Sequence, residues 1–576
     1  MNNKIQALRE RSQGLLSKKL TLNTFWQNIA YNFYPQRAFF TRVSTSADQD
    51  IVDNFFPFNG DFANNLTTSY PILVSRDLAN SISTYLRPAG QKWFKAAIRN
   101  KELDKNLGNA ARKYLEFVTD TMYYFFEDEA TGFNKAMRQS DADVTNFGQS
   151  AISMELDWNT TNLMVRCWTL RDMAWSEDYA GNVNFIVREW NTKVRTAYEK
   201  FGKKLHPETV AKVTQQGDTN ITIHHIVLKT EDYESFYKKT NFGEEKKKIK
   251  LPWVSIYVEV GKDHEIECVG SPTEIYRINR WELVSGSQYA YSPAICAGLP
   301  DARLLQSITL SLLEAGEKAV NPPILAKADS VREDIAFIAN TVSWVKEDLP
   351  GSIDDAVKMM QIDRSGLQFG LTMQQDSRAM LRSAFFLDKI QLPVFDSRMT
   401  ATEVRERVAE YIRNASPLFN SMITQINQPT CKMAFELLKS AGAFGPNDFI
   451  PDELRDPNTG ELRKDIDFTF SSPLLEAEGK EKAQRFLEMK AAIAEAVAID
   501  PSTIYIPDAT IALRDTLEGI GVPAKWLRDE DVVVGMVEQE KQQQQAQQFV
   551  QQLTAGGQAA EQIGKGAQAV QQAGLV

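Results

Sequence analysis

The chain has 576 residues and a mass of 65.1 kDa, more than one hydrophobic core usually serves, so several structural units are expected. Hydrophobic residues make up 43% of the sequence and charged residues 24%, which excludes wholesale disorder, a collagen-like fibre and a simple coiled coil. The net charge of −10 disfavours strong static binding of nucleic acid through its phosphates, but it is compatible with transient passage of DNA past an acidic wall.

The helical and strand patterns alternate along the chain. Apolar spacing predicts a helical pair over residues 5–37, broken before Tyr34-Pro35, and further helices over 71–86 and 109–128. Between residues 164 and 284 the pattern changes to period two and β-branched runs, such as "LMVRCWTL", "NVNFIVREW", "NITIHHIVL" and "WVSIYVEV", with a helix over 192–201. This part of the chain is therefore predicted to carry a sheet.

Helices return in the second half. A helix is predicted over 301–319, and it ends at Asn321-Pro322-Pro323, because two successive prolines cannot continue it. A small mixed segment follows, then a helix over 372–387 and a long helix from about 400 to 438, with kinks expected at Pro417 and Pro429. The end of the chain, from residue 539, is rich in Gln and Gly and is predicted to bury little.

The sequence offers no recognisable catalytic or cofactor motif. The segment "GQAAEQIGKG" has six residues between its first two glycines instead of four, and Gly566 stands where a Ser or Thr should follow "GK", so it is not a phosphate-binding loop. The acidic segment "DADVTNFG" over 141–148 departs from a calcium loop, and we interpret it as a turn between helices. No G-x-S-x-G elbow is present, and therefore neither an enzyme nor a cofactor is predicted.

Cysteine and histidine spacing argues against a metal site. Four cysteines lie far apart, and we expect reduced, mostly packed thiols; they are Cys167, Cys268, Cys296 and Cys431. The adjacent His224 and His225 should point to opposite sides of one strand, so they could not share a metal. The longest apolar candidate, residues 335–345, is far short of the roughly 18 residues that a membrane helix needs. We expect a protein of a reducing cytoplasm with no membrane span.

Six strings, taken together and in order, resemble the head-to-tail connector or portal protein of short-tailed, T7-like bacteriophages. They are "FWQNIAYNFYPQR" (25–37), "ANSISTYLRPAGQKWFKAAI" (79–98), "DVTNFGQSAISME" (143–155), "SPAICAGLPDARLLQSI" (292–308), "NPPILAKADS" (321–330) and "RMTATEVRERVAEYIRNASPLFNSMI" (398–423). The resemblance covers roughly residues 1–480.

The resemblance implies an α+β, predominantly helical subunit of a ring, expected to have twelve copies. The expected parts are an α/β wing over 1–300 and 400–475, stem helices over 301–320 and 371–387, a small α/β clip over 321–370, a tunnel loop over 388–399, and a helical crown or barrel over 476–576. Such a ring would sit at one capsid vertex as a channel for double-stranded DNA packaging and ejection. Its expected partners are other copies of the chain, terminase, capsid and scaffold proteins and a tail adaptor, in the host cytoplasm during assembly and then in the virion.

The layout that the resemblance implies also gives candidate site residues. The tunnel loop would present Lys389, Gln391, Phe395, Asp396 and Arg398 to DNA. In the clip, Lys327, Lys346 and Lys358 would line the channel exit or meet the tail adaptor. The alternative for each is a solvated or intersubunit residue. The clip span 321–364 has five basic and eight acidic residues, a net charge of −3, so its wall would repel phosphates and let DNA slide.

Two other readings stay open from the sequence. A tail or adaptor structural protein of the virion would share the context, but it need not have two helices flanking a proline-marked insertion. A soluble host-directed enzyme would need a clustered site, which the residues do not indicate.

Trp93 and Phe94 are predicted to be core or interface anchors.

Overall fold

The computed structural model describes a defined part of the chain: residues 2–41, 66–99, 107–157, 162–239, 250–320, 324–326, 357–359, 365–390, 417, 419–456, 460, 462–463, 466–470, 485–493, 512–513, 516–517, 522, 526, 532–533, 535–536 and 538–540. The chain divides into two compact units. The first comprises Met1–Gln91 and Tyr124–Ala441, and the second comprises Lys92–Tyr123 and Gly442–Val576.

The first unit opens with the predicted helical pair, α1 (Asn2–Lys18) and α2 (Leu20–Phe33), followed by the short helix η1 (Pro35–Arg37). Lys19 lies at the bend between α1 and α2 and is buried. Its ammonium donates hydrogen bonds to the carbonyl oxygens of Leu170 (2.7 Å), Arg171 (2.9 Å) and Met173. This one side chain therefore ties the bend to residues 170–173.

The predicted sheet is a five-stranded antiparallel meander. Its strands are β4 (Met173–Glu177), β5 (Val183–Lys193), β6 (Asn220–Lys229), β7 (Trp253–Glu259) and β8 (His264–Ser271), in that order. Three helices interrupt it: α7 (Val194–Phe201), α8 (Pro207–Gln215) and α9 (Thr230–Lys239). The strand predictions and the helix over 192–201 are confirmed, the latter from Val194.

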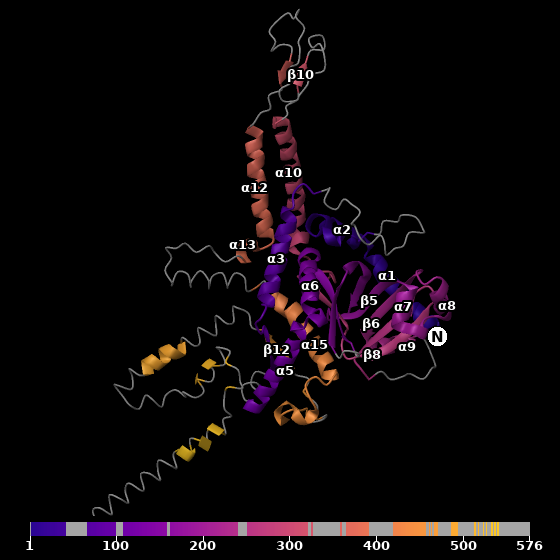
Figure 1. The fold of residues 1–576 in the computed structure, drawn as a ribbon, viewed down its shortest axis with the longest axis vertical. Helices are drawn as coiled ribbons and strands as arrows, with labels where there is room; N and C mark the ends of the chain where they lie inside the picture. Colours follow the sequence, from indigo (N-terminus) through magenta and orange to yellow (C-terminus); the bar gives the residue numbers. More distant parts are fainter. Residues whose placement is uncertain are drawn as a thin grey trace, which may run out of the picture. The chain divides into compact units, whose positions relative to one another are not determined.

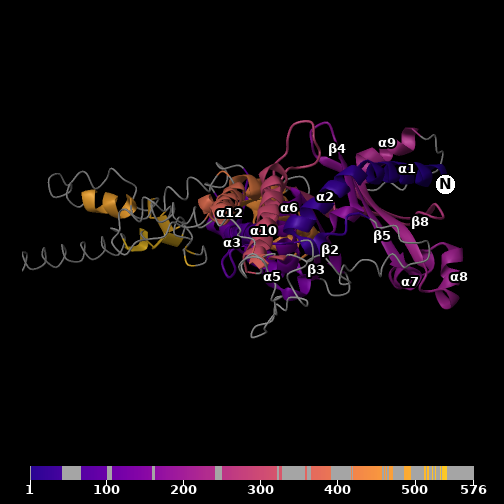
Figure 2. The same cartoon turned by 90° about the horizontal axis from the view of Figure 1, so that it is seen from above.

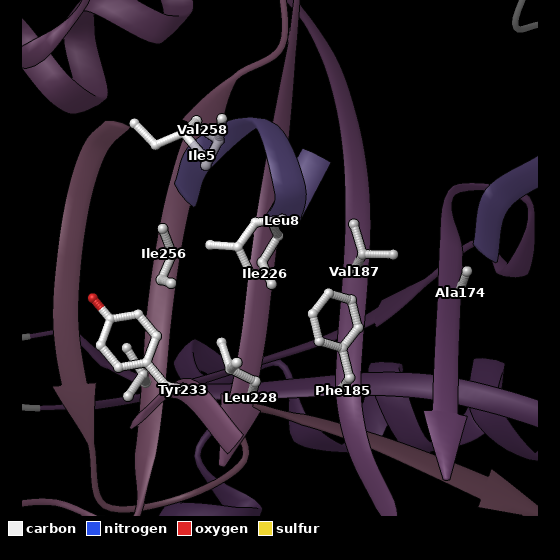
Figure 3. Close-up of a cluster of buried hydrophobic side chains, with 11 residues drawn as sticks. Ile5, Leu8, Ala174, Phe185, Val187, Ile226, Leu228, Tyr233, Ile256 and Val258 are labelled. Carbon is white, nitrogen blue, oxygen red and sulfur yellow. The ribbon is translucent and has the colours of Figure 1, made fainter. Parts of the chain in front are cut away.

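Helices cover both faces of this sheet (Figure 2). On one face, Ile5 and Leu8 of α1 and Tyr233 of α9 pack on the alternate strand residues, among them Val187 and Ile226 (Figure 3). On the other face, a second cluster is built around α7; it includes Ala197, Phe201, Ile223, Tyr257 and Ile266. Because successive side chains of a strand point to opposite faces, the strands contribute apolar residues to a layer on each face of the sheet.

A three-stranded sheet lies against the polar part of the second face. Its order is β3 (Asn162–Trp168), β2 (Gln149–Asp157) and β9 (Tyr276–Arg280). His225 of β6 contacts Tyr276 of β9, whereas the His224 imidazole faces Glu189, 3.8 Å away. The two adjacent histidines therefore face opposite sides of β6, as predicted. Among the described residues, no group of three or more His, Cys, Asp or Glu could hold a metal ion.

One prediction was wrong: residues 141–147 are not a turn between helices. They belong to α6 (Phe133–Phe147), which ends at Gly148 with φ +77°. Asp141 and Asp143 are buried on this helix and pair with Arg87 and Arg37 respectively, the latter at 3.0 Å. Burial raises the pKa of both carboxyls, and the arginine charges oppose this effect.

Further helices of the first unit are α3 (Tyr70–Leu86) and α15 (Gln428–Ser440). Of the predicted long helix over 400–438, residues 400–416 lie outside the described residues. The later part contains one π turn, Ile423–Asn427, directly before Pro429 near the start of α15. A proline cannot donate a hydrogen bond to the preceding turn, which accounts for an irregular ladder at this position.

In the second unit, β1 (Phe94–Ile98) pairs antiparallel with β12 (Ile466–Phe470), and the Ala96 N–H of β1 donates to Thr119 Oγ1 of α5 (Asn109–Glu127) at 3.0 Å. Trp93 and Phe94 are buried, as predicted, and the Trp93 ring stacks on Phe470.

Taken together, the described residues are mostly helical with a sheet-containing domain, which confirms the predicted class. None of the helices that the structure describes has the length and apolar character to cross a bilayer. Cys431 is buried, whereas Cys296 is exposed, so not all four thiols are packed.

Candidate functional site

Two long helices extend side by side from the first unit, and the predicted site lies at their two ends (Figure 1). They are α10 (Leu299–Val320) and α12 (Ser365–Ala384). α10 matches its predicted range, and α12 begins earlier and ends earlier than the predicted 372–387. The Gln374 amide donates to Thr309 Oγ1 at 2.9 Å, and Gly370 lies beside Leu312, so the helices run antiparallel.

The close approach of α10 and α12 depends on Gly370. A Cβ atom at this position would lie 2.7 Å from Leu312 Cδ2, closer than carbon atoms pack. Near the rest of the first unit, which we call the body, the Gln306 side chain accepts hydrogen bonds from the backbone N–H groups of Thr67 (2.8 Å) and Thr68 (2.9 Å). The pair is thus closely packed along its length and fixed at its base.

Away from the base, the two helices expose large apolar side chains. From Ser307 to the end of α10 no residue is buried. Leu313 is 58% exposed and Phe369 of α12 is 69% exposed. We call the full set the apolar stripe; it consists of Leu304, Leu310, Leu313, Val320, Phe369, Leu371, Met373 and Met380. Exposed apolar side chains that gather on one part of a protein often mark an interaction site.

The far end of the pair holds a short antiparallel ladder, β10 (Ile324–Ala326) with β11 (Val357–Met359) (Figure 1). Lys358 is the central residue of β11, opposite Leu325. The other two predicted clip residues, Lys327 and Lys346, lie outside the described residues.

The near end turns from α12 into the short helix α13 (Leu387–Ile390). Lys389 is exposed on α13, and its ammonium lies 5.7 Å from the centre of the Phe386 ring. Asp388 and Lys389 were predicted to begin a loop, but they are helical. The remaining predicted residues, Gln391, Phe395, Asp396 and Arg398, lie outside the described residues.

α13 is anchored to the body on two sides. The Phe385 ring is buried against Phe33, with ring centres 5.3 Å apart, and it fills the space beside Gly298. The Tyr85 hydroxyl of α3 donates to the carbonyl oxygen of Ile390 at 3.3 Å. Lys389 is therefore a long cationic side chain on a fixed support.

Sequence reasoning missed two features of the segment that joins α12 to α13. Phe386 has φ +56°, a conformation that favours glycine, and nothing in an aromatic residue indicates it. Trp281 stacks on Phe386 from more than 100 positions away, so no local pattern links them. Gly370, in contrast, carried a usable indication, because glycine within a helix often marks a close approach.

The chain matches the family described as bacteriophage head to tail connecting protein over residues 6–527. It is 24% identical over 511 residues to a probable portal protein of Bordetella phage BPP-1, covering 87% of this chain and 86% of that protein. It is 21% identical over 373 residues to the portal protein of Salmonella phage epsilon15, covering 64% of each.

Among solved structures, a chain of the virion of a native gene transfer agent particle is similar, at 10% identity and a TM-score of 0.35, covering 74% of this chain and 86% of that one. A chain from the neck of an empty gene transfer agent particle has 11% identity and a TM-score of 0.33, with the same coverage. The family match spans nearly the whole sequence and agrees with the resemblance found in six of its segments. The chain therefore belongs to the family of bacteriophage head-to-tail connecting proteins.

Proposed function

We propose that this protein is a portal subunit, one copy of a ring at a single capsid vertex through which double-stranded DNA is packaged and ejected. Family membership gives the connecting role, and two relatives are named as portal proteins. The proposed role is structural, with no catalytic step. Terminase would attach to the ring first and the tail adaptor later, and capsid and scaffold proteins would surround it.

The observation that carries the ring is the apolar stripe along α10 and α12. Leu313 and Phe369 are more than half exposed in the single chain, and neighbouring copies would remove them from water. The stripe occupies helices, which offer a rigid, repeated surface for a neighbour. Cyclic repetition of one such contact closes into a ring without unpaired faces.

The parts of the portal layout can be assigned to the described elements. The five-stranded sheet and its helices would form the wing, α10 and α12 the stem, and β10 with β11 part of the clip. The tunnel loop would follow α13, and residues 476–576 would form the crown or barrel. Six residues that the alignment gave to the clip, 365–370, are helical and would extend the second stem helix.

The proposed DNA contacts are weak and repeated. Lys389 is exposed at the end of a fixed support, and in a ring of twelve it would form one circle of positive charge. The tunnel-loop residues Gln391, Phe395, Asp396 and Arg398 would add to this circle. Lys327, Lys346 and Lys358 would lie in a clip whose net charge of −3 prevents tight binding. Such a channel would guide DNA with little sequence preference.

Oligomeric mass tests the ring. Light scattering on the purified protein, paired with negative-stain images, should give about twelve times 65.1 kDa, near 780 kDa, with a central hole. Leu313→Glu and Phe369→Glu should each reduce the mass toward the monomer, because a buried unpaired carboxylate disfavours the contact. Tyr179→Glu, at a fully exposed hairpin tip, is the matched control and should leave the ring intact. A large particle without a hole would contradict the proposal.

Packaged DNA tests the channel. Particles assembled with Lys389→Glu or Arg398→Glu should contain intact rings but less DNA than wild-type particles. Lys203→Glu changes an exposed lysine outside the proposed stem, clip and tunnel loop, and it controls for the change in net charge. Normal DNA content in both channel variants would remove the tunnel-loop assignment. Normal packaging in particles that lack the protein altogether would favour a tail or adaptor role.

A further inference from the structure

The corner between α12 and α13 contains an unusual residue. Phe386 follows the end of α12 with φ +56°, in the left-handed region. Glycine commonly occupies this position after a helix, because a side chain there crowds the backbone. A bulky aromatic residue in this conformation persists only where its surroundings hold it.

Several contacts hold Phe386 in this conformation. The Trp281 ring stacks on it, with ring centres 6.4 Å apart and planes 15° apart, and Trp281 is itself buried. The Phe386 N–H donates to the carbonyl oxygen of Ser383 at 3.0 Å. Its own carbonyl oxygen accepts hydrogen bonds from the N–H groups of Lys389 and Ile390, both at 3.0 Å.

The same residue controls where Lys389 lies. Its carbonyl oxygen closes the turn of α13, and its ring lies beneath the Lys389 ammonium at 5.7 Å, within reach of a cation–π attraction. Leu387 and Ile390 are buried, so α13 cannot roll freely on the body. Lys389 is the exposed cation of this helix, and its position is set by the backbone and the ring of Phe386 together.

A glycine would satisfy the backbone at this corner without strain, but it could neither stack on Trp281 nor lie beneath Lys389. We propose that Phe386, braced by Trp281, is a positioning residue that fixes α13 and directs the Lys389 ammonium at DNA in the channel. This inference rests on the proposed portal function. It assigns to Phe386 no contact with DNA of its own.

A double-mutant cycle tests the proposal in assembled particles made with the full-length chain. The variants are Phe386→Gly, Lys389→Glu and the two combined, and the measurements are ring mass, thermal midpoint and DNA per particle. Phe386→Gly should keep the ring, because glycine suits the backbone, and yet lower the DNA per particle. The combined variant should package no less DNA than Lys389→Glu alone, because both act through one ammonium. Asp263→Gly changes another residue with positive φ, on the wing, and should package normally.

The outcomes separate the inference from the function on which it rests. If Lys389→Glu lowers DNA content but Phe386→Gly does not, the positioning role is wrong and the channel role stands. Independent, additive losses in the combined variant would also overturn the positioning role. If Lys389→Glu itself packages normally, the channel role of Lys389 is wrong. Should Phe386→Gly fail to assemble, Trp281→Leu removes the brace alone, and normal DNA content in that variant would overturn the proposal.

Discussion

The imidazole Nδ1 of His225 lies 2.6 Å from the phenol oxygen of Tyr276, and this contact joins β6 of the five-stranded sheet to β9 of the three-stranded sheet. Arg188 Nε donates to the same phenol oxygen at 2.7 Å, so the phenol proton is free to bond His225. His225 Nε2 lies 2.8 Å from Ser255 Oγ, and the ring stacks on Tyr257. This arrangement fits a neutral imidazole.

Acid should loosen this junction. Burial lowers the pKa of His225 well below its usual value, and the charges of Arg188 and Lys200 lower it further. Glu155 of β2 is also near Tyr257 and Tyr276, but its negative charge does not reverse the lowering of the His225 pKa. Below about pH 6.5 the His225 imidazole binds a proton in the unfolded chain but not in the folded chain. The free energy of unfolding should therefore fall by up to about 1.4 kcal/mol per pH unit as the pH falls.

The measurement is hydrogen exchange of β6 and β9 between pH 7.5 and 5.5, corrected for the intrinsic exchange rate. Wild-type protein should lose protection as the pH falls, and His225→Gln should show a flatter dependence. His264→Gln, on the edge strand β8, is the control and should follow the wild type. Equal pH dependence in the wild type and His225→Gln would disprove the assignment.

Lys19→Met should destabilise the first unit. The substitution keeps the length of the side chain but removes its hydrogen bonds to the carbonyl oxygens of Leu170, Arg171 and Met173, of which only that of Leu170 is known to keep another donor, the Met173 N–H. A buried carbonyl without a partner costs about 1–3 kcal/mol, so a loss of about 2 kcal/mol or more in the free energy of unfolding is expected. Denaturant titration followed by tryptophan fluorescence measures it. Lys18→Met changes the adjacent exposed lysine, and an equal loss there would refute the role of Lys19.

Gly148→Ala should be much more harmful than Gly90→Ala. Both glycines have φ near +75°, and alanine in that conformation costs about 1–2 kcal/mol. At Gly148 the new Cβ would also lie 2.5 Å from the Ala290 carbonyl oxygen, whereas at Gly90 it would meet nothing. We expect Gly148→Ala to lose about 1–3 kcal/mol more, by thermal unfolding. Equal losses would show that α6 can shift away from Ala290 at no cost.

Gly370→Gln should separate α10 from α12, and Gly366→Gln should not. Glutamine favours a helix over glycine at both positions, by somewhat less than about 1 kcal/mol. Only the Cβ at Gly370 would collide, with Leu312, because Gly366 has open space beside it. The expected result is faster hydrogen exchange in 307–320 for Gly370→Gln and unchanged or slower exchange for Gly366→Gln. Similar exchange in both variants would mean that Leu312 moves aside easily.

The sequence was most informative where local pattern decides structure. The helix over 301–319, the strands from β5 to β7 and the opposite directions of His224 and His225 all follow from periodicity, and the structure has them. The turn predicted at 141–148 failed for a physical reason. Asp141 and Asp143 look solvated in the sequence, but their arginine partners stand 54 and 106 positions away and make burial tolerable.

The candidate site was only partly predictable. Lys389 is exposed on α13, and its place in a tunnel loop and its contact with DNA stay predictions. The conformation of Phe386 depends on Trp281 and on the packing of α13, and neither can be read from neighbouring residues. Backbone strain that distant contacts stabilise produces no periodic pattern in the sequence. The conformation of Phe386 could therefore be found only in the structure.

The antiparallel pairing of α10 with α12 also means that the segment between them leaves and returns at neighbouring points, where β10 and β11 join. The length of that segment can change without moving either helix, because the closure of its ends is already provided and longer loops add little cost. We therefore expect insertions or deletions between β10 and β11 to leave the packing of α10 on α12 unchanged.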